Sequence, residues 1–257
     1  MHFKHWLAIA LCATLLLSGA AARTVSADDT IPVVKKSYTA PGQTPVDVYT
    51  TSLPNRTATA VVLAHGFGSA QQVMADLAEA IARKGFVAVT FDFTGHGRNP
   101  NPLDEADPFP QFESDLDHAV EFALTLPGVA HVALLGHSVG ANIVVLYALG
   151  HSDIAATIEL SGNTTEVTPD APRNFLLLVG SAEEQGVLDD YTDALQNAGP
   201  LGNSPLDFLK GRARAGVIIP DADHTSILFD PATLTAVGDW LDGLKAAARE
   251  GRSKLKP

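Results

Sequence analysis

Short apolar runs alternate along the chain with longer segments in which apolar residues recur every three or four positions. A continuous apolar run of five or six residues is typical of a strand buried on both faces, whereas four-residue spacing is typical of a helix with one buried face. The helical spacing is seen at Val73, Leu77 and Ile81. It recurs at Phe112, Leu116, Val120 and Leu124. The apolar runs are 59–64, 86–91, 131–135, 156–160, 174–179 and 214–219.

This alternation predicts an α/β fold with a mostly parallel central sheet and helices on both faces. Two further strands, 33–39 and 45–53, are joined by the turn residues Pro41 and Gly42 and predict an antiparallel hairpin at one edge of the sheet. A final helix from about Pro231 to Ala248 is expected to close the domain.

The first 27 residues differ from the rest of the chain. Lys4 precedes an apolar run, 6–17, that is too short to span a bilayer comfortably but suits the core of a signal peptide. Small residues at 20–22 and 25–27 offer two cleavage sites, and we expect the second, which leaves an α/β domain over residues 28–257. The protein is then secreted or periplasmic without a stable membrane span; an uncleaved anchor is the alternative.

Composition narrows the chemistry of the 257-residue chain. Its formal net charge of −12 argues against a nucleic-acid groove, because phosphate binding needs clustered Lys and Arg. The single cysteine, Cys12, lies in the expected signal segment, so the mature chain has neither a disulfide nor a cysteine nucleophile. The nine histidines show no H-x-H or H-E-x-x-H spacing that would indicate a metal site.

The strongest chemical signal is the segment Leu134-Leu135-Gly136-His137-Ser138-Val139-Gly140-Ala141. An apolar strand ends there in two glycines that bracket Ser138, and an apolar segment of helical length follows. A serine in so sharp a turn projects its hydroxyl above the sheet, and a Cβ at either glycine would clash. This G-x-S-x-G arrangement resembles the nucleophile elbow of the α/β-hydrolase family.

Two loops strengthen the resemblance. The sequence His65-Gly66-Phe67-Gly68 follows the first buried strand and resembles the family's oxyanion loop. By that resemblance, the amides of Phe67 and Val139 form the oxyanion hole. The stretch Asp92-Phe93-Thr94-Gly95-His96-Gly97-Arg98 resembles the D-x-x-G-x-G loop of lipase-like and serine-aminopeptidase-like members. We interpret this second loop as structural and His96 as a loop residue rather than a catalyst.

The resemblance also assigns the base and the acid. His224 follows the last strand, where the family carries its catalytic histidine, and it satisfies the order Ser, acid, His. The family usually has G-x-x-D after the preceding strand, and this chain has Gly180-Ser181-Ala182-Glu183. Glu183 is therefore expected to orient the histidine, with Glu184 and Glu166 as the alternatives.

A serine hydrolase that acts on small-molecule carboxylic esters is the function implied. Ser138 attacks the carbonyl, His224 moves the proton, Glu183 orients His224, and no cofactor is needed. An amidase, peptidase or lactonase on the same triad remains open, as does a non-catalytic binding protein on a hydrolase scaffold. Only about a dozen residues separate the strands at 156–160 and 174–179, so no large lid is expected. The sequence leaves the oligomeric state open.

Overall fold

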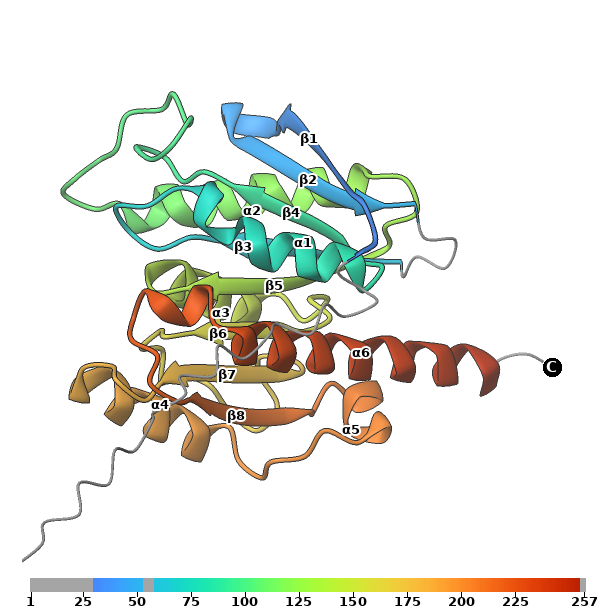
Figure 1. Ribbon diagram of the computed structural model, residues 1–257. Coiled ribbons are helices and arrows are strands. Elements are labelled where there is room, and N and C mark those ends of the chain that lie inside the picture. The colour runs from blue at the N-terminus through green and yellow to red at the C-terminus, as the bar shows by residue number, and fades with distance from the viewer. Residues whose placement is uncertain (1–29, 53–57, 255–257) are drawn as a thin grey trace, which may run out of the picture.

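The computed structural model describes residues 30–52 and 58–254 (Figure 1). Its centre is an eight-stranded sheet in the order β1-β2-β4-β3-β5-β6-β7-β8. β1 and β2 form the predicted antiparallel hairpin at one edge, and β2 pairs antiparallel with β4. From β4 to β8 every pair of neighbours is parallel. The strands are β1 (Val33–Thr39), β2 (Pro45–Thr51), β3 (Thr59–Ala64), β4 (Val87–Phe91), β5 (His131–His137), β6 (Thr157–Leu160), β7 (Phe175–Gly180) and β8 (Arg214–Ile219).

Helices cover both faces of the sheet, as Figure 1 shows. α1 (Ala75–Arg83) and α6 (Pro231–Lys254) pack on one face, and the short helix α5 (Pro205–Lys210) packs against α6. α2 (Phe109–Thr125), α3 (Val139–Gly150) and α4 (Gln185–Asn197) pack on the other face. The predicted α/β architecture is thus confirmed. The short 3-10 segments η2 (Pro41–Gln43), η3 (Gln71–Met74) and η4 (Ser226–Leu228) lie in the connections between these elements.

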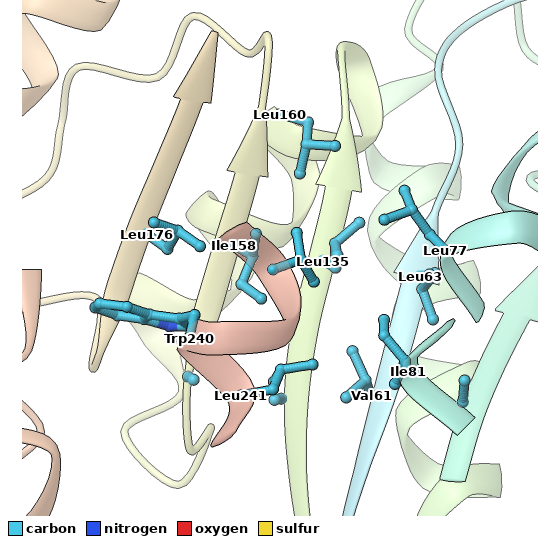
Figure 2. Packing of buried hydrophobic residues seen from close by; sticks show 14 of the residues in the cluster. Val61, Leu63, Leu77, Ile81, Leu135, Ile158, Leu160, Leu176, Trp240 and Leu241 are labelled. Carbon is cyan, nitrogen blue, oxygen red and sulfur yellow. The ribbon is translucent and has the colours of Figure 1, made fainter. Parts of the chain in front are cut away.

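The two cores on either side of the sheet explain the continuous apolar runs. Successive side chains of a strand point to opposite faces. Val61 and Leu63 of β3 therefore join the core under α1 and α6 (Figure 2), while Val62 joins the core under α2 and α3. All six residues of β3 are buried. A strand covered on both faces needs an apolar side chain at every position, not at every second one.

Leu124, α6 and β2 differ from the sequence-based elements. Leu124 is 46% exposed, whereas its neighbour Ala123 is fully buried, so Leu124 does not belong to the buried face of α2. Each four-residue step overshoots a full helical turn, and three steps carry a residue roughly 120° around the helix. α6 continues to Lys254, beyond the expected end at Ala248. β2 ends at Thr51, and Leu53 lies outside the described residues.

The connection between β6 and β7 carries no inserted helix, so the expectation of no large lid is confirmed. The expected signal segment, residues 1–27, lies outside the described residues. Within the part of the chain that the structure describes, no helix is both long enough and apolar enough to cross a membrane.

Candidate active site

Ser138 lies in the turn between β5 and α3 with a backbone φ of 55° and ψ of −125°. A non-glycine residue held in so rare a conformation costs about 1–3 kcal/mol, which the surrounding packing must offset. A Cβ on Gly136 would collide with the Gly140 carbonyl, and a Cβ on Gly140 would collide with the carbonyl of His65. The two glycines are therefore required by the close approach of β5, α3 and the loop after β3.

Ser138, His224 and Glu183 lie in one hydrogen-bonded line, although they come from three separate loops. His224 Nε2 is 2.8 Å from Ser138 Oγ, and His224 Nδ1 is 3.1 and 3.2 Å from the two carboxylate oxygens of Glu183. Because a carboxylate only accepts hydrogen bonds, Nδ1 carries the proton and Nε2 is free to accept from the serine hydroxyl. The Glu183 side chain is 2% exposed and that of His224 is 45% exposed.

The loops after β7 and β8 are locked together, and this sets the separation of the acid and the histidine. A Cβ on Gly180 would collide with the Ala222 carbonyl, so only glycine allows the two loops to approach. The Ala182 amide donates to that same carbonyl, at 2.9 Å. Ser181 Oγ accepts from the Asp221 amide at 2.8 Å. Glu183 is thereby held beside the histidine loop.

The two alternative acids lie elsewhere. Glu184 is exposed at the N-terminal end of α4, where it is the N-cap residue. Glu166 is exposed, and its carboxylate accepts from the neighbouring Thr165 amide at 3.1 Å. Among the described residues, the carboxylate that hydrogen-bonds His224 is that of Glu183.

The loop after β3 carries Phe67, the first expected oxyanion donor, and His65, which holds the peptide before it. His65 is fully buried; its Nδ1 donates to the Gly66 carbonyl at 2.7 Å, and its Nε2 accepts from the Phe93 amide at 3.2 Å. Burial lowers the pKa of His65 to about 4, so the ring stays neutral in this role. A trans peptide is planar, so fixing the Gly66 carbonyl also fixes the direction of the Phe67 N–H.

Val139, the second expected oxyanion donor, is the first residue of α3. The Ala141 and Asn142 amides donate to the Ser138 carbonyl, at 2.9 and 3.2 Å, whereas an amide at the first position of a helix has no carbonyl partner within the helix. The Val139 amide is therefore the one in this turn that we expect to meet a negative charge beside Ser138. The positive end of the α3 dipole adds to this effect.

Asp92 is the anchor of the D-x-x-G-x-G loop and is fully buried. It accepts hydrogen bonds from the backbone and side chain of Gln71, at 2.8 and 2.7 Å, and from the Arg98 amide at 3.0 Å. A Cβ on Gly97 would collide with the Asp92 carboxylate. The loop is thus held by its first acid, in keeping with the structural role expected of it.

His137 has a part in the site that sequence reasoning missed. Its Nε2 donates to the backbone carbonyl of His224 at 2.7 Å, so the residue before the nucleophile holds the histidine loop. Burial lowers the pKa of His137 to about 4, which keeps the ring neutral with its proton on Nε2. The sequence signal was a histidine inside the buried end of a strand.

A cavity of about 350 Å³ opens beside Ser138 on the side of α4. Its wall includes Asn142 and Asn163, whose side chains are hydrogen-bonded to each other, and the carboxylates of Glu184 and Asp190. Ser161 also lines it, and its buried Oγ has no hydrogen-bond partner among the described residues. The space next to the nucleophile therefore carries two acidic side chains on this side.

Metal ligands do not gather in the described part of the chain: no three His, Cys, Asp or Glu side chains there are placed to hold an ion.

Comparison with known proteins gives the site a context. Residues 55–198 match the family described as serine aminopeptidase, S33. A monoglyceride lipase homolog from monkeypox virus is 36% identical over 95 residues, which are 37% of this chain and 34% of that protein. The match thus spans about a third of the length of that relative.

Solved structures share the fold at low identity. A serine hydrolase without a lid from Xanthomonas campestris has a TM-score of 0.59 and 18% identity, with 83% of this chain and 94% of that chain covered. An esterase from Pyrococcus furiosus has a TM-score of 0.59 and 15% identity, over 82% and 92% of the two chains. A CIB-like hydrolase from Thermoplasma acidophilum has a TM-score of 0.61 and 16% identity, over 82% and 98%.

Proposed function

Because this chain belongs to the serine aminopeptidase S33 family of α/β-hydrolases, we propose that it is a serine hydrolase that cleaves small-molecule carboxylic esters through an acyl-enzyme. Hydrolase chemistry comes with the family, whereas the nucleophile, the triad and the ester substrate are proposed from this site. One observation carries the proposal: the continuous hydrogen-bonded line from Glu183 through His224 to the strained Ser138.

In the first half of the reaction, Ser138 Oγ attacks the ester carbonyl while His224 Nε2, 2.8 Å away, takes the hydroxyl proton. The imidazolium that forms is stabilised by the Glu183 carboxylate at Nδ1. When the tetrahedral intermediate collapses, the same Nε2 returns the proton to the departing alcohol. The acyl group remains on Ser138 as an ester.

In the second half, a water molecule gives its proton to His224 Nε2 and attacks the acyl carbon. The second tetrahedral intermediate releases the carboxylic acid, and the proton returns to Ser138 Oγ. The amides of Phe67 and Val139 donate to the oxyanion in both intermediates. One such donor contributes about 3 kcal/mol to the barrier reduction in a comparable site.

Ester hydrolysis is favoured by the similar proteins, which include a monoglyceride lipase homolog and an esterase. An aminopeptidase is the second candidate, because the family carries that description and the acidic wall of the cavity, with Glu184 and Asp190, suits an ammonium group. A binding protein without catalysis would have no need of a strained serine aligned with a histidine.

Export is a further part of the proposal and is supported by the sequence pattern. Residues 1–27 direct the chain across a membrane and are removed after Ala27, so the mature protein is secreted or periplasmic and begins at Asp28. N-terminal sequencing of exported protein checks this. An intact residue 1 on a membrane-bound product would contradict it and favour an anchor.

Labelling with a fluorophosphonate probe tests the proposed function, together with turnover of p-nitrophenyl butyrate and alanine p-nitroanilide. We expect covalent label on Ser138 and faster ester than anilide turnover. Ser138→Ala should lose label and turnover at an unchanged melting temperature, whereas Ser161→Ala, in the same cavity wall, should keep both. A folded wild-type protein that neither labels nor turns over would refute catalysis, and a faster anilide would favour the aminopeptidase.

A further inference from the structure

His96, in the loop after β4, has both ring nitrogens engaged. Its Nδ1 is 2.9 Å from the Thr94 carbonyl, and its Nε2 is 2.9 Å from the backbone amide of Gly68. A carbonyl can only accept, so Nδ1 carries the proton. Nε2 is then the acceptor for the Gly68 N–H. The two hydrogen bonds therefore define one tautomer of His96, and the residue is buried, with 8% of its surface exposed.

The Gly68 amide belongs to the peptide that follows Phe67, the proposed oxyanion donor. The peptide before Phe67 is held by His65 through the Gly66 carbonyl, at 2.7 Å. The peptide after it is held by His96 through the Gly68 N–H. Both peptide planes that meet at the Phe67 Cα are thus fixed by an imidazole. Because each plane is rigid, the backbone of Phe67 cannot rotate without breaking one of these bonds.

Gly68 is not held by side-chain packing, so the hydrogen bond to His96 has no steric substitute. Gly68 has a φ of 69°, in the left-handed region, and a Cβ built on it would meet no atom within 4 Å. A glycine in open space is free to change conformation at little steric cost. The hydrogen bond to His96 Nε2 is therefore the restraint that defines this end of the oxyanion loop.

The two loops hold each other reciprocally. His65, from the loop after β3, accepts from Phe93 in the loop after β4, and His96 accepts in the opposite direction. The rings also pack together: the His96 centroid lies 5.4 Å from that of His65, 5.1 Å from Phe67 and 5.6 Å from Phe112. Neither loop can shift alone.

We propose that His96 is a positioning residue for catalysis: its Nε2 holds the Phe67–Gly68 peptide so that the Phe67 N–H faces the oxyanion formed at Ser138. His96 touches none of the reacting atoms. The inference rests on the proposed serine hydrolase mechanism. It gives a function to a loop histidine that lies outside the Ser138–His224–Glu183 line.

Two substitutions separate the hydrogen bond from the packing. His96→Phe keeps an aromatic ring against Phe67 and Phe112 but has no acceptor, whereas His96→Gln can place an amide oxygen near the position of Nε2. We expect His96→Phe to lower kcat about tenfold with KM within about twofold, since complete removal of an oxyanion donor costs about 10²–10³. His96→Gln should stay within about threefold of the wild type. His118→Phe, on α2, is the matched control and should leave kcat unchanged.

A trifluoromethyl ketone reports on the oxyanion itself, because serine adds to it to form a stable tetrahedral anion. Its affinity should fall in His96→Phe by the same factor as kcat, while the affinity for the product acid stays constant. The proposal is overturned if folded His96→Phe retains kcat within about twofold, or if His96→Phe and His96→Gln lose activity equally.

The wild-type protein provides a test that needs no variant. Imidazole nitrogen NMR should show the His96 proton on Nδ1 and a coupling between Nε2 and the Gly68 amide; a proton on Nε2 would contradict the proposal. Failure of the proposed function looks different, because the wild-type protein would then lack fluorophosphonate labelling and ester turnover whatever the state of His96.

Discussion

The two sides of Ser138 are built differently. On the oxyanion side, the loops after β3 and β4 are joined by two buried imidazoles, His65 and His96, and the buried Asp92 accepts three hydrogen bonds. On the acid–base side, the loops after β7 and β8 are hydrogen-bonded to each other, and the His224 side chain is 45% exposed. The histidines on one side are therefore buried, and the histidine on the other side is partly exposed to solvent.

Sheet topology accounts for this difference. β3 and β4 have neighbours on both sides, whereas β8 is an edge strand with β7 as its one neighbour (Figure 1). His65 and His96 follow interior strands and are covered by the rest of the domain, while His224 follows the edge strand and meets solvent on one side. His224 is therefore more exposed than the two histidines that hold the oxyanion loop.

The division suits the chemistry proposed for each side. Dipoles that stabilise an oxyanion are most effective when they do not reorganise during the reaction. A histidine that carries a proton from Ser138 to a departing alcohol must instead serve two partners in turn. His137 connects the two arrangements, because it lies in the elbow and donates to the His224 carbonyl.

The largest effect is expected from the acid–base side. Glu183→Gln should lower kcat by about 10⁴, because the amide can hold His224 in the wrong tautomer, as in a comparable triad. Glu184→Gln and Glu166→Gln make the same substitution at the two alternative acids, and their kcat should stay within about threefold of the wild type. The measurement is kcat of all three variants on one ester, with melting temperatures as the folding control. A near-normal Glu183→Gln beside a collapsed Glu184→Gln or Glu166→Gln would move the acid to that residue.

The next prediction concerns buried groups and the pH dependence of folding. His65 and His137 have pKa values of about 4, against about 6.5 in the unfolded chain, because burial disfavours their charged forms. Below pH 6.5 the unfolded state therefore binds more protons than the folded state. The free energy of unfolding, which has its full value above pH 6.5 as far as these two rings are concerned, falls as the pH is lowered towards 4. The loss is on the order of 3 kcal/mol for each histidine at the end of that range.

Glu159 has the opposite effect on the pH dependence of the free energy of unfolding. Burial raises its pKa to about 8, so the folded state retains a proton that the unfolded chain loses above about pH 4.5. Stability then falls as the pH rises from 4.5 to 8. Two histidines outweigh one glutamate below pH 6.5, and Glu159 acts alone above it, so the free energy of unfolding should be highest near pH 6.5. Urea unfolding from pH 4.5 to 8.5 measures this, and Glu159→Gln should remove the alkaline decline. A steady rise to pH 8 in the wild type would contradict the prediction.

The smallest expected effect is the change in kcat/KM for each methylene added to the acyl chain of the substrate. With no inserted lid, and with a cavity of only about 350 Å³ beside the serine whose wall carries Glu184 and Asp190, burial of added methylenes should stop early. Each buried methylene contributes about 0.8 kcal/mol, or roughly fourfold in kcat/KM. We expect kcat/KM for p-nitrophenyl esters to rise over short and medium chains and then level off, without a jump when the substrate forms micelles. A steep continued rise to long chains would contradict this prediction and would show an acyl site larger than the cavity.

Much of the fold follows from the sequence pattern. The strand at 59–64 begins and ends as predicted, because burial on both faces demands a continuous apolar run. The strands at 33–39 and 214–219 also begin and end as predicted, although both lie at the edges of the sheet and are partly exposed. Leu124 shows the limit of the pattern, since four-residue spacing drifts off the buried face of α2.

The proposed catalytic residues could be placed in sequence because each follows a strand within a short motif. Ser138 is marked by its two glycines, and Glu183 by its spacing from Gly180. The parts played by His96 and His137 could not be read in this way, because they depend on hydrogen bonds between loops that follow different strands. The sequence does not indicate that His96 Nε2 lies 2.9 Å from the Gly68 amide nitrogen.

The acyl-enzyme itself is the most direct test of the account. The mature protein, mixed with p-nitrophenyl butyrate and quenched in acid within the first turnovers, should gain the mass of one butyryl group, and peptide mapping should place that group on Ser138. Glu183→Gln should form the adduct more slowly at the same residue. Ester turnover with no adduct at Ser138, or with the butyryl group on another residue, would contradict the mechanism.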